Sequence, residues 1–144
     1  MNRSDWTLLT ISAAKGQPLS PVQLQKAMFL LWKNLPQVFG IESYRFVPHN
    51  YGPFDARVYS DAEMLARQGL VYIMTRSSGG WSEYGATPLG LNKANEIERH
   101  VDPQVRQYLF QIVDWVRQLS FQDLVRSIYQ AYPEYRANSV FQSG

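Results

Sequence analysis

Apolar residues recur at helical spacing along most of the chain, and prolines and glycines separate the periodic segments. The clearest helix start is at Ser20, where an N-capping serine precedes Pro21 at the first helical position and Gln23 completes a capping box. Four large side chains then share one face, at spacings of four, three and four: Leu24, Met28, Leu31 and Leu35. The pattern predicts a central amphipathic helix that ends at Pro36.

The same criteria predict five further helices. Ser4, Asp102 and Ser120 are suitable N-cap residues, and Pro103 stands at a first helical position. Gly69 suits the position just after a helix end, where glycine adopts the left-handed conformation without strain. The six predicted helices cover residues 4–14, 20–35, 55–68, 88–100, 102–119 and 120–132.

Three segments have the pattern of extended chain or turns. Residues 44–48 alternate like a short strand, and Gly52 with Pro53 predicts a turn. Residues 70–75 and 81–87 are strand-like, and the Ser- and Gly-rich stretch between them predicts a β-hairpin. The predicted fold class is therefore mainly α with a small β-hairpin, an α+β domain.

The order of these elements narrows the fold further. A third helix followed directly by a hairpin is the order of a winged helix, in which the hairpin is the wing. The run from Tyr84 to Gly90 is similar to a second wing strand that leads into the next helix. No linker or repeat divides the chain, so we expect a single winged-helix-like helical domain over residues 1–136. A polar tail, to which we assign no function, follows over residues 137–144.

The composition excludes several classes of protein. The chain has no cysteine, which excludes disulfide scaffolds, thiolate zinc sites and cysteine nucleophiles. Its 14 Lys and Arg against 12 Asp and Glu give a net charge too small to drive binding to nucleic acid by itself. The N-terminus lacks the pattern of a signal peptide, and the longest strongly apolar run, residues 27–32, is far too short to cross a membrane. We expect a cytoplasmic protein that does not contact membranes.

The residues that could carry catalysis are few. His49 and His100 are the only imidazoles, and no histidine pair or carboxylate-rich loop completes a metal site. The Gly79-Gly80 pair lacks the lysine and the following helix of a phosphate-binding loop, and no serine lies in a nucleophile elbow. We therefore predict a protein that is not an enzyme and that uses no metal and no cofactor. An enzyme centred on His49 is the weakest alternative.

Three short motifs resemble those of a known protein family. Residues 24–30 (LQKAMFL), 49–54 (HNYGPF) and 128–135 (IYQAYPEY) are similar, in this order, to motifs of the Panacea or SocA-like antitoxin domains and of the related YwgA-like proteins of bacteria and phages. The resemblance implies a helix-rich domain without an established catalytic site. It also implies a protein partner, such as the toxin encoded by a neighbouring gene, which the domain neutralises or for which it acts as an adaptor.

The aromatic content favours a protein partner as well. Nine Tyr, seven Phe and four Trp exceed what one small core must bury, and Tyr and Trp are the residues that most often anchor interfaces. The candidates for exposure are Tyr51, Phe54, Tyr59, Trp81, Tyr84, Tyr132 and Tyr135, and packing in the core or in a turn is the alternative for each ring. The residues predicted to bind the partner are Arg45, His49, Tyr51, Phe54, Arg57, Trp81, Tyr132 and Tyr135.

The alternative hypothesis is a winged-helix transcriptional regulator that binds DNA, with a homodimer through the fifth and sixth helices left open. The residues predicted to contact DNA are Arg57, Arg67, Arg76, Ser77 and Ser78. Three carboxylates on the presumed recognition helix argue against this hypothesis because they would repel phosphates: Asp55, Asp61 and Glu63.

Overall fold

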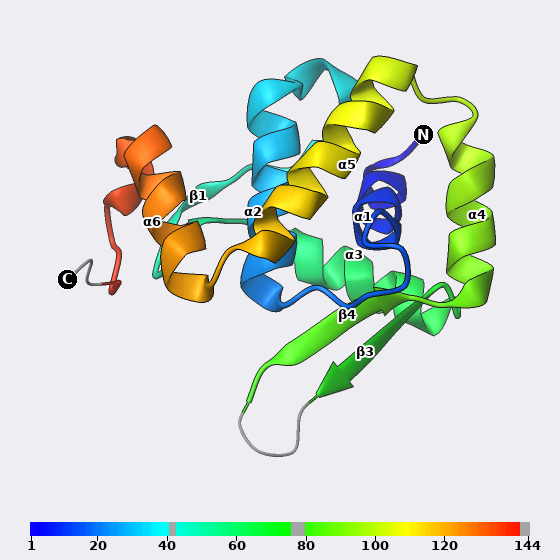
Figure 1. Ribbon diagram of the computed structural model, residues 1–144, viewed down its shortest axis with the longest axis horizontal. Helices are drawn as coiled ribbons and strands as arrows, with labels where there is room; N and C mark the ends of the chain where they lie inside the picture. Colours follow the sequence, from blue (N-terminus) through cyan, green and yellow to red (C-terminus); the bar gives the residue numbers. More distant parts are fainter. Residues whose placement is uncertain (41–42, 76–79, 142–144) are drawn as a thin grey trace.

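The computed structural model describes residues 1–40, 43–75 and 80–141. The described part of the chain forms six α-helices, two short 3-10 helices and two separate two-stranded antiparallel sheets (Figure 1). The α-helices are α1 Arg3–Ser12, α2 Pro21–Asn34, α3 Ala56–Arg67, α4 Pro88–Glu98, α5 Pro103–Gln118 and α6 Phe121–Ala131. The remaining elements are η1 Pro36–Val38, β1 Val47–His49, β2 Gly52–Phe54, β3 Val71–Thr75, β4 Ser82–Ala86 and η2 Pro133–Arg136. The fold is thus mainly α with a small β-hairpin, as the sequence predicts.

The helix starts follow the capping residues with one exception. Ser20 and Gln23 form the expected capping box at α2, and Asp102 and Ser120 cap α5 and α6. The prediction that Ser4 caps α1 is wrong, because Asn2 forms a capping box with Asp5 and starts the helix earlier. The Ser4 hydroxyl instead donates to the Asn2 side chain across 2.8 Å.

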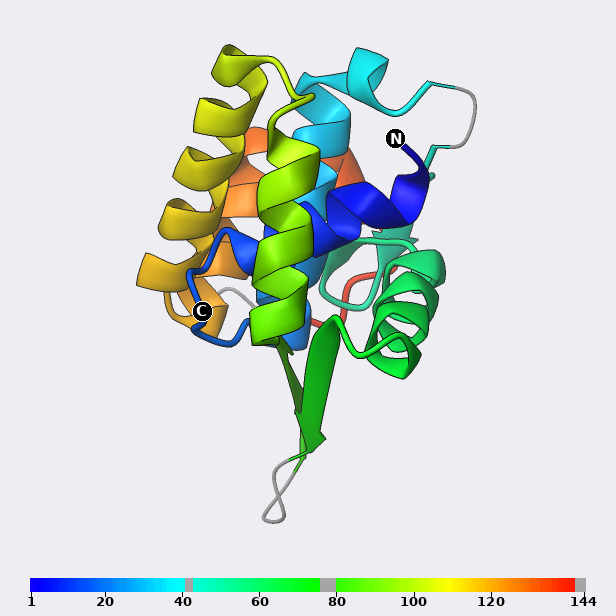
Figure 2. The same ribbon diagram turned by 90° about the vertical axis from the view of Figure 1, so that its right-hand side faces the viewer.

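The hairpin of β3 and β4 has the position of a wing. The strands pair from Val71 with Ala86 to Thr75 with Ser82, and Figure 2 shows the hairpin projecting away from the helices. Leu19, between α1 and α2, pairs with Tyr84 of β4 through two backbone hydrogen bonds of 2.8 and 2.9 Å. The order from α1 through Leu19, α2 and α3 to the hairpin is that of a winged helix.

A second hairpin, β1 with β2, lies between α2 and α3 in the sequence and replaces the predicted strand over residues 44–48. The prediction that Gly52 and Pro53 form its turn is wrong, because both residues belong to β2 and the turn falls on Asn50 and Tyr51. Pro53 lies opposite Pro48 in the register. Neither proline has an N–H to donate, so these two residues cannot exchange ladder hydrogen bonds and fit only a non-hydrogen-bonded position of an antiparallel pair.

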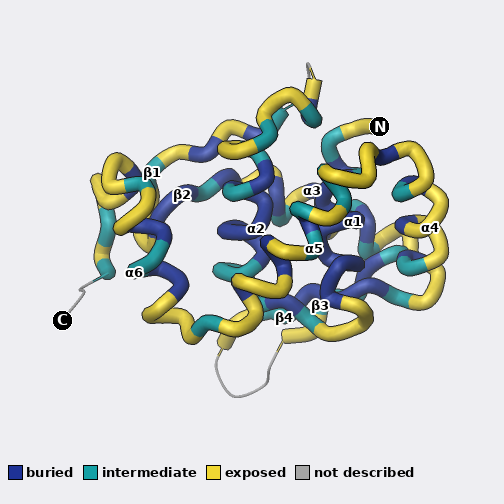
Figure 3. Tube along the Cα trace, turned by 45° about the horizontal axis from the view of Figure 1, so that its top comes forward, coloured by how far each residue is buried: buried dark blue, intermediate teal, exposed yellow. Residues whose placement is uncertain are grey.

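Helix α2 forms the centre of the core. Leu24, Met28 and Leu31 are fully buried, as predicted, and Ala27 and Phe29 are buried with them. The fourth residue of the predicted face, Leu35, is only half-buried, because it follows the helix as its C-cap. Figure 3 shows α1 and α2 buried along most of their length, whereas α4 is exposed along its outer side. None of the described helices is long and apolar enough to span a membrane.

The residues after η2 pack back onto the second hairpin. The N–H of Val140 donates to the carbonyl oxygen of Asn50 across 2.9 Å. The Ser139 hydroxyl accepts from Tyr129 and donates to the same Asn50 carbonyl. Phe141 contacts the rings of Tyr129 and Phe121. The chain from residue 139 to residue 141 is therefore held against the β1–β2 turn and α6.

Candidate functional site

Two of the three motifs from the sequence meet directly in the structure. The Gln25 side chain of α2 accepts from the Asp55 N–H at 3.1 Å and donates to the Asp55 carbonyl at 2.9 Å. The neighbouring Lys26 Nζ donates to the Pro53 carbonyl oxygen at 3.1 Å. The Gln-Lys pair of α2 therefore satisfies backbone groups at the end of β2, and it fixes the second hairpin against the central helix.

Asp55 joins this arrangement to the start of α3. Its carboxylate caps the helix by accepting from the Arg57 N–H, and it also accepts from the Arg45 N–H at 2.6 Å. The Arg57 guanidinium forms an ion pair with it at 2.6 Å. Burial alone would raise the pKa of Asp55, but the hydrogen bonds from Arg57 and the backbone outweigh it and hold that pKa below its usual value.

The third motif packs on the same helix. The rings of Tyr132 and Tyr135 lie edge-on to Phe29 of α2, with centroids 5.1 and 4.8 Å away. A side chain added at Gly52 would contact both Tyr129 and Lys26 at 3.4 Å, so the late motif also reaches the second hairpin. Two candidates for exposure, Tyr135 and Tyr84, are buried, with only 7% of each residue accessible. Their rings pack in the hydrophobic core.

A cleft of about 460 Å³ opens beside these contacts. It lies between the N-terminal half of α2, the β1–β2 hairpin, the junction of α5 and α6, and the start of β4. The residues that line it are Ser20, Pro21, Val22, Gln23, Gln25, Lys26, His49, Asn50, Tyr51, Gly52, Phe54, Tyr59, Trp81, Leu119, Phe121 and Leu124. Most of this lining is apolar or aromatic, which is typical of a site that binds an apolar group.

Three aromatic side chains at the cleft are exposed to solvent. Trp81 is 56% exposed, and Tyr51 and Phe121 are each 44% exposed. Tyr51 and Phe121 contact each other edge-to-face at 5.1 Å. We call these three residues the aromatic rim. Large exposed aromatic groups around a concave apolar surface mark a binding site, because a soluble protein otherwise buries such area.

His49 and Phe54 form a further part of the cleft wall. Their rings stack at 4.5 Å with an interplanar angle of 24°. Phe54 in turn contacts Tyr59 of α3 at 5.8 Å, and Tyr59 stacks on Tyr84 of the wing. This line of rings connects the second hairpin, α3 and the wing, so the cleft is built on packed elements.

Lys26 is the charged residue in the cleft wall. Only 3% of it is accessible, and burial lowers the pKa of its amine to about 7. Within the described residues, no carboxylate forms an ion pair with it. Its position inside the Leu-Gln-Lys motif was visible in the sequence, but the pattern of that helix did not show that this lysine is buried.

The structure brings half of the predicted partner-binding residues together. His49, Tyr51, Phe54 and Trp81 all line the cleft. The other four lie elsewhere: Arg45, Arg57, Tyr132 and Tyr135. Sequence reasoning missed Lys26 and Phe121. Phe121 stands at the first position of α6 and is exposed there.

The structure describes two of the five residues predicted to contact DNA. Arg57 and Arg67 are both exposed on α3, whereas Arg76, Ser77 and Ser78 lie outside the described residues. The argument that three carboxylates on this helix would repel phosphates does not hold for two of them, because Asp55 and Asp61 are buried. Asp61 accepts from the Arg3 guanidinium at 2.8 and 3.1 Å and from the Tyr44 hydroxyl, and only Glu63 of the three is exposed.

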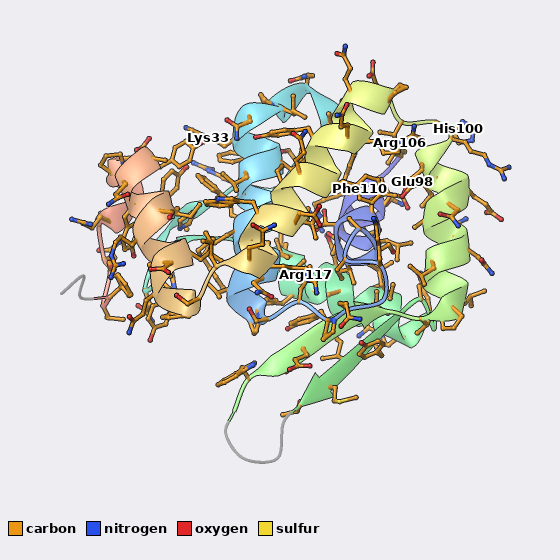
Figure 4. The ribbon with its side chains drawn as sticks, in the orientation of Figure 1. Lys33, Glu98, His100, Arg106, Phe110 and Arg117 are labelled. Carbon is orange, nitrogen blue, oxygen red and sulfur yellow. The ribbon has the colours of Figure 1, made fainter. Side chains whose placement is uncertain are left out.

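The remaining charged groups are dispersed. Figure 4 shows Lys33 on α2 and Arg106 and Arg117 towards opposite ends of α5, so these three cations do not form one patch. His100 lies just beyond the end of α4 (Figure 4), whereas His49 belongs to β1, on the opposite side of α2 from α4 (Figure 1). Among the described residues, no three His, Asp or Glu side chains gather closely enough to hold a metal ion.

The comparisons with known proteins add no relative. No protein-family model matches the chain, and no curated protein matches it.

Proposed function

We propose that this chain is a protein-binding domain without catalytic activity that uses the cleft and its aromatic rim to bind a partner protein. The biological role that we propose is that of an antitoxin or adaptor of a bacterial or phage toxin–antitoxin or defence locus, acting in the cytoplasm. The observation that carries the proposal is the exposure of Tyr51, Trp81 and Phe121 around one apolar cleft. The motif resemblance supports the role.

The cleft is suited to a protein segment for two physical reasons. Its walls are held by the Gln25 and Lys26 hydrogen bonds and by packed rings, so little entropy is lost when a partner binds. Burial of large rings such as Trp81 supplies most of the free energy at such interfaces. Binding there would cover the partner's own functional surface, and the partner would be inhibited by steric masking.

Co-purification with the product of the adjacent gene tests the proposal. The tagged chain and the untagged product are co-expressed, and their affinity is measured with purified proteins. Trp81→Ala and Tyr51→Ala are each expected to weaken binding at least tenfold and to abolish rescue of growth if the product is toxic. Trp115→Ala, an exposed tryptophan of α5 outside the cleft, is the matched control and is expected to bind like the wild type.

Two results would overturn the proposal. One is a folded wild-type chain that neither binds the product nor restores growth. The other is full binding by both cleft variants, because the partner would then use a different surface.

A second candidate function, DNA binding, is favoured by two features of the fold. The Leu19 bridge completes the element order of a winged helix, and α3 exposes Arg67 and also Arg57, whose guanidinium pairs with the buried Asp55. A regulator of this kind would place α3 in the major groove and the wing beside the phosphate backbone.

Salt dependence tests this second candidate. Binding to the promoter of the chain's own locus should weaken steeply between low and physiological salt, since phosphate contacts release counterions. Arg67→Ala should reduce the affinity, whereas Lys93→Ala on the exposed side of α4 should not. Absence of binding at low salt would eliminate DNA recognition.

A further inference from the structure

We propose that the cleft recognises an acidic side chain of the partner protein, whose carboxylate pairs with Lys26 while neighbouring apolar side chains of the partner pack against the aromatic rim. This inference rests on the proposed function, because it specifies the chemistry of the segment that occupies the same cleft. It assigns Lys26 a role in recognition in addition to its contact with the second hairpin.

The hydrogen bonding of Lys26 leaves capacity for such a ligand. An ammonium group has three N–H donors. Within the described residues, the Pro53 carbonyl oxygen is the one acceptor of the Lys26 Nζ, and no ion pair neutralises its charge. The side chain is almost fully buried and lines the cleft. A carboxylate that enters the cleft therefore meets an amine with free N–H donors.

The energetics favour a carboxylate over a neutral group. Burial disfavours the charged form of Lys26, as its lowered pKa of about 7 indicates. The side chain is already removed from water in the folded protein, so binding adds the desolvation of the partner's carboxylate and the uptake of a proton by whatever fraction of the amine is neutral. A charge pair shielded from water attracts more strongly than one on the surface, and the incoming carboxylate would restore the protonated amine.

The other polar groups of the cleft are less suited to this task. The Gln25 amide is engaged with Asp55, and the Gln23 amide contacts the Ser20 N–H and the Val116 carbonyl. His49 is exposed and stacked on Phe54, so any charge on it would be screened by water. Lys26 is thus the group from which specificity for an acid can come.

The rim indicates a side chain within a segment rather than a chain terminus. It consists of two separate parts, the Tyr51–Phe121 pair beside α6 and Trp81 at the start of the wing. A partner segment that contacts both parts continues across the cleft. An acidic residue in the middle of that segment, with apolar residues on either side, then faces Lys26.

Selection from random 16-residue peptides displayed on phage tests the inference with the full chain as the target. The selected peptides are expected to carry Asp or Glu next to apolar residues. For a synthetic selected peptide, replacing the acid by its amide, Glu→Gln or Asp→Asn, should weaken binding to the wild-type protein at least tenfold. This measurement needs no variant of the protein, so it stays decisive if Lys26 cannot be replaced without loss of folding.

Variants of the protein supply the matching arm. Lys26→Met should weaken binding of the acidic peptide at least tenfold. It should also remove the difference in affinity between the acidic and the amide peptide. Lys33→Met is the control, because Lys33 is an exposed lysine near the C-terminal end of the same helix and outside the cleft (Figure 4). It should bind both peptides like the wild type.

The outcomes separate this inference from the proposed function. Peptides whose binding depends on Trp81 but not on an acid would overturn the role of Lys26 and leave the cleft as the binding site. Dependence on a free peptide C-terminus instead of an internal acid, measured with free-acid and amidated peptides, would also overturn it. Failure to select any peptide whose binding depends on Trp81 or Tyr51 would count against both.

Discussion

The Lys26 Nζ donates a hydrogen bond to the Pro53 carbonyl oxygen across 3.1 Å and so joins the middle of α2 to β2. Pro53 has no N–H, but its carbonyl still needs a partner because the residue is buried. The lysine supplies that partner from a different part of the chain. The same contact draws the amine out of water and places it in the wall of the cleft.

Burial of Lys26 predicts that stability depends on pH. The amine has a pKa of about 7 in the folded chain and 10.5 in the unfolded chain, so between these values the unfolded chain binds the extra proton. Between about pH 7 and 10, the free energy of unfolding of the wild type should therefore rise with pH relative to that of Lys26→Met. Below pH 7 the two proteins should show parallel pH dependence. Urea unfolding of both proteins from pH 6 to 9.5 measures this. Parallel curves over the whole pH range would show that folding does not lower the pKa of Lys26.

The two hydrogen bonds between Gln25 and the Asp55 backbone predict a specific loss on truncation. Gln25→Ala should lower the free energy of unfolding by about 1 to 3 kcal/mol, because it leaves the buried Asp55 N–H without a partner and leaves the Asp55 carbonyl with the Val58 N–H as its remaining donor. Gln122→Ala, at an exposed position of α6, should change it by about 0.5 kcal/mol or less. Denaturant melts of the two variants measure these changes. Equal losses of free energy of unfolding would contradict the hydrogen bonds assigned to Gln25.

Gly90 predicts a steric effect at the first turn of α4. A Cβ at this position would lie 1.8 Å from the Leu70 carbonyl oxygen, which belongs to backbone and cannot rotate away. Gly90→Ala should therefore cost about 3 kcal/mol or more, although alanine normally favours a helix over glycine. Asn92→Ala at an exposed position of the same helix should be neutral or slightly stabilising. A Gly90→Ala protein with wild-type stability would show that α4 does not approach Leu70 this closely.

The central position of α2 predicts a large cavity effect at Leu31. This side chain is fully buried, so Leu31→Ala should lower the free energy of unfolding by about 2 to 5 kcal/mol. Leu89→Ala is the matched control, since Leu89 is exposed at the start of α4. Its loss should stay near 0.5 kcal/mol. Similar losses for the two leucines would mean that the buried face of α2 is assigned incorrectly.

The sequence was a good guide to the elements because their signals are local. Ser20, Pro21 and Gln23 act within one helical turn, and they start α2 where the structure starts it. The errors arose where two local signals compete or where the partner is distant. Ser4 and Asn2 are both good caps, and only the reach of the Asp5 side chain decides between them. Gly52 and Pro53 have turn propensity, but their pairing with β1 places them in a strand.

The candidate site was predicted only in part for the same reason. His49, Tyr51 and Phe54 are close in sequence and remain close in the structure, whereas Trp81 joins them through the packing of the wing. Tyr135 is a tyrosine like Tyr51, and its local sequence pattern is similar. Its ring nevertheless packs on Phe29 and is buried. Residue type indicates that a ring can bind a partner, but its neighbours decide whether it is exposed.

The sequence by itself determined the helices, the wing and the fold class, because caps, prolines and hydrophobic periodicity act over a few residues. Only the tertiary structure decided where the cleft lies and which groups line it, since its walls come from α2, the second hairpin, α3, the α5–α6 junction and Trp81 just before β4. The tertiary structure also decided the pKa of Lys26. The sequence shows a lysine, but its pKa depends on desolvation by segments that folding brings around it.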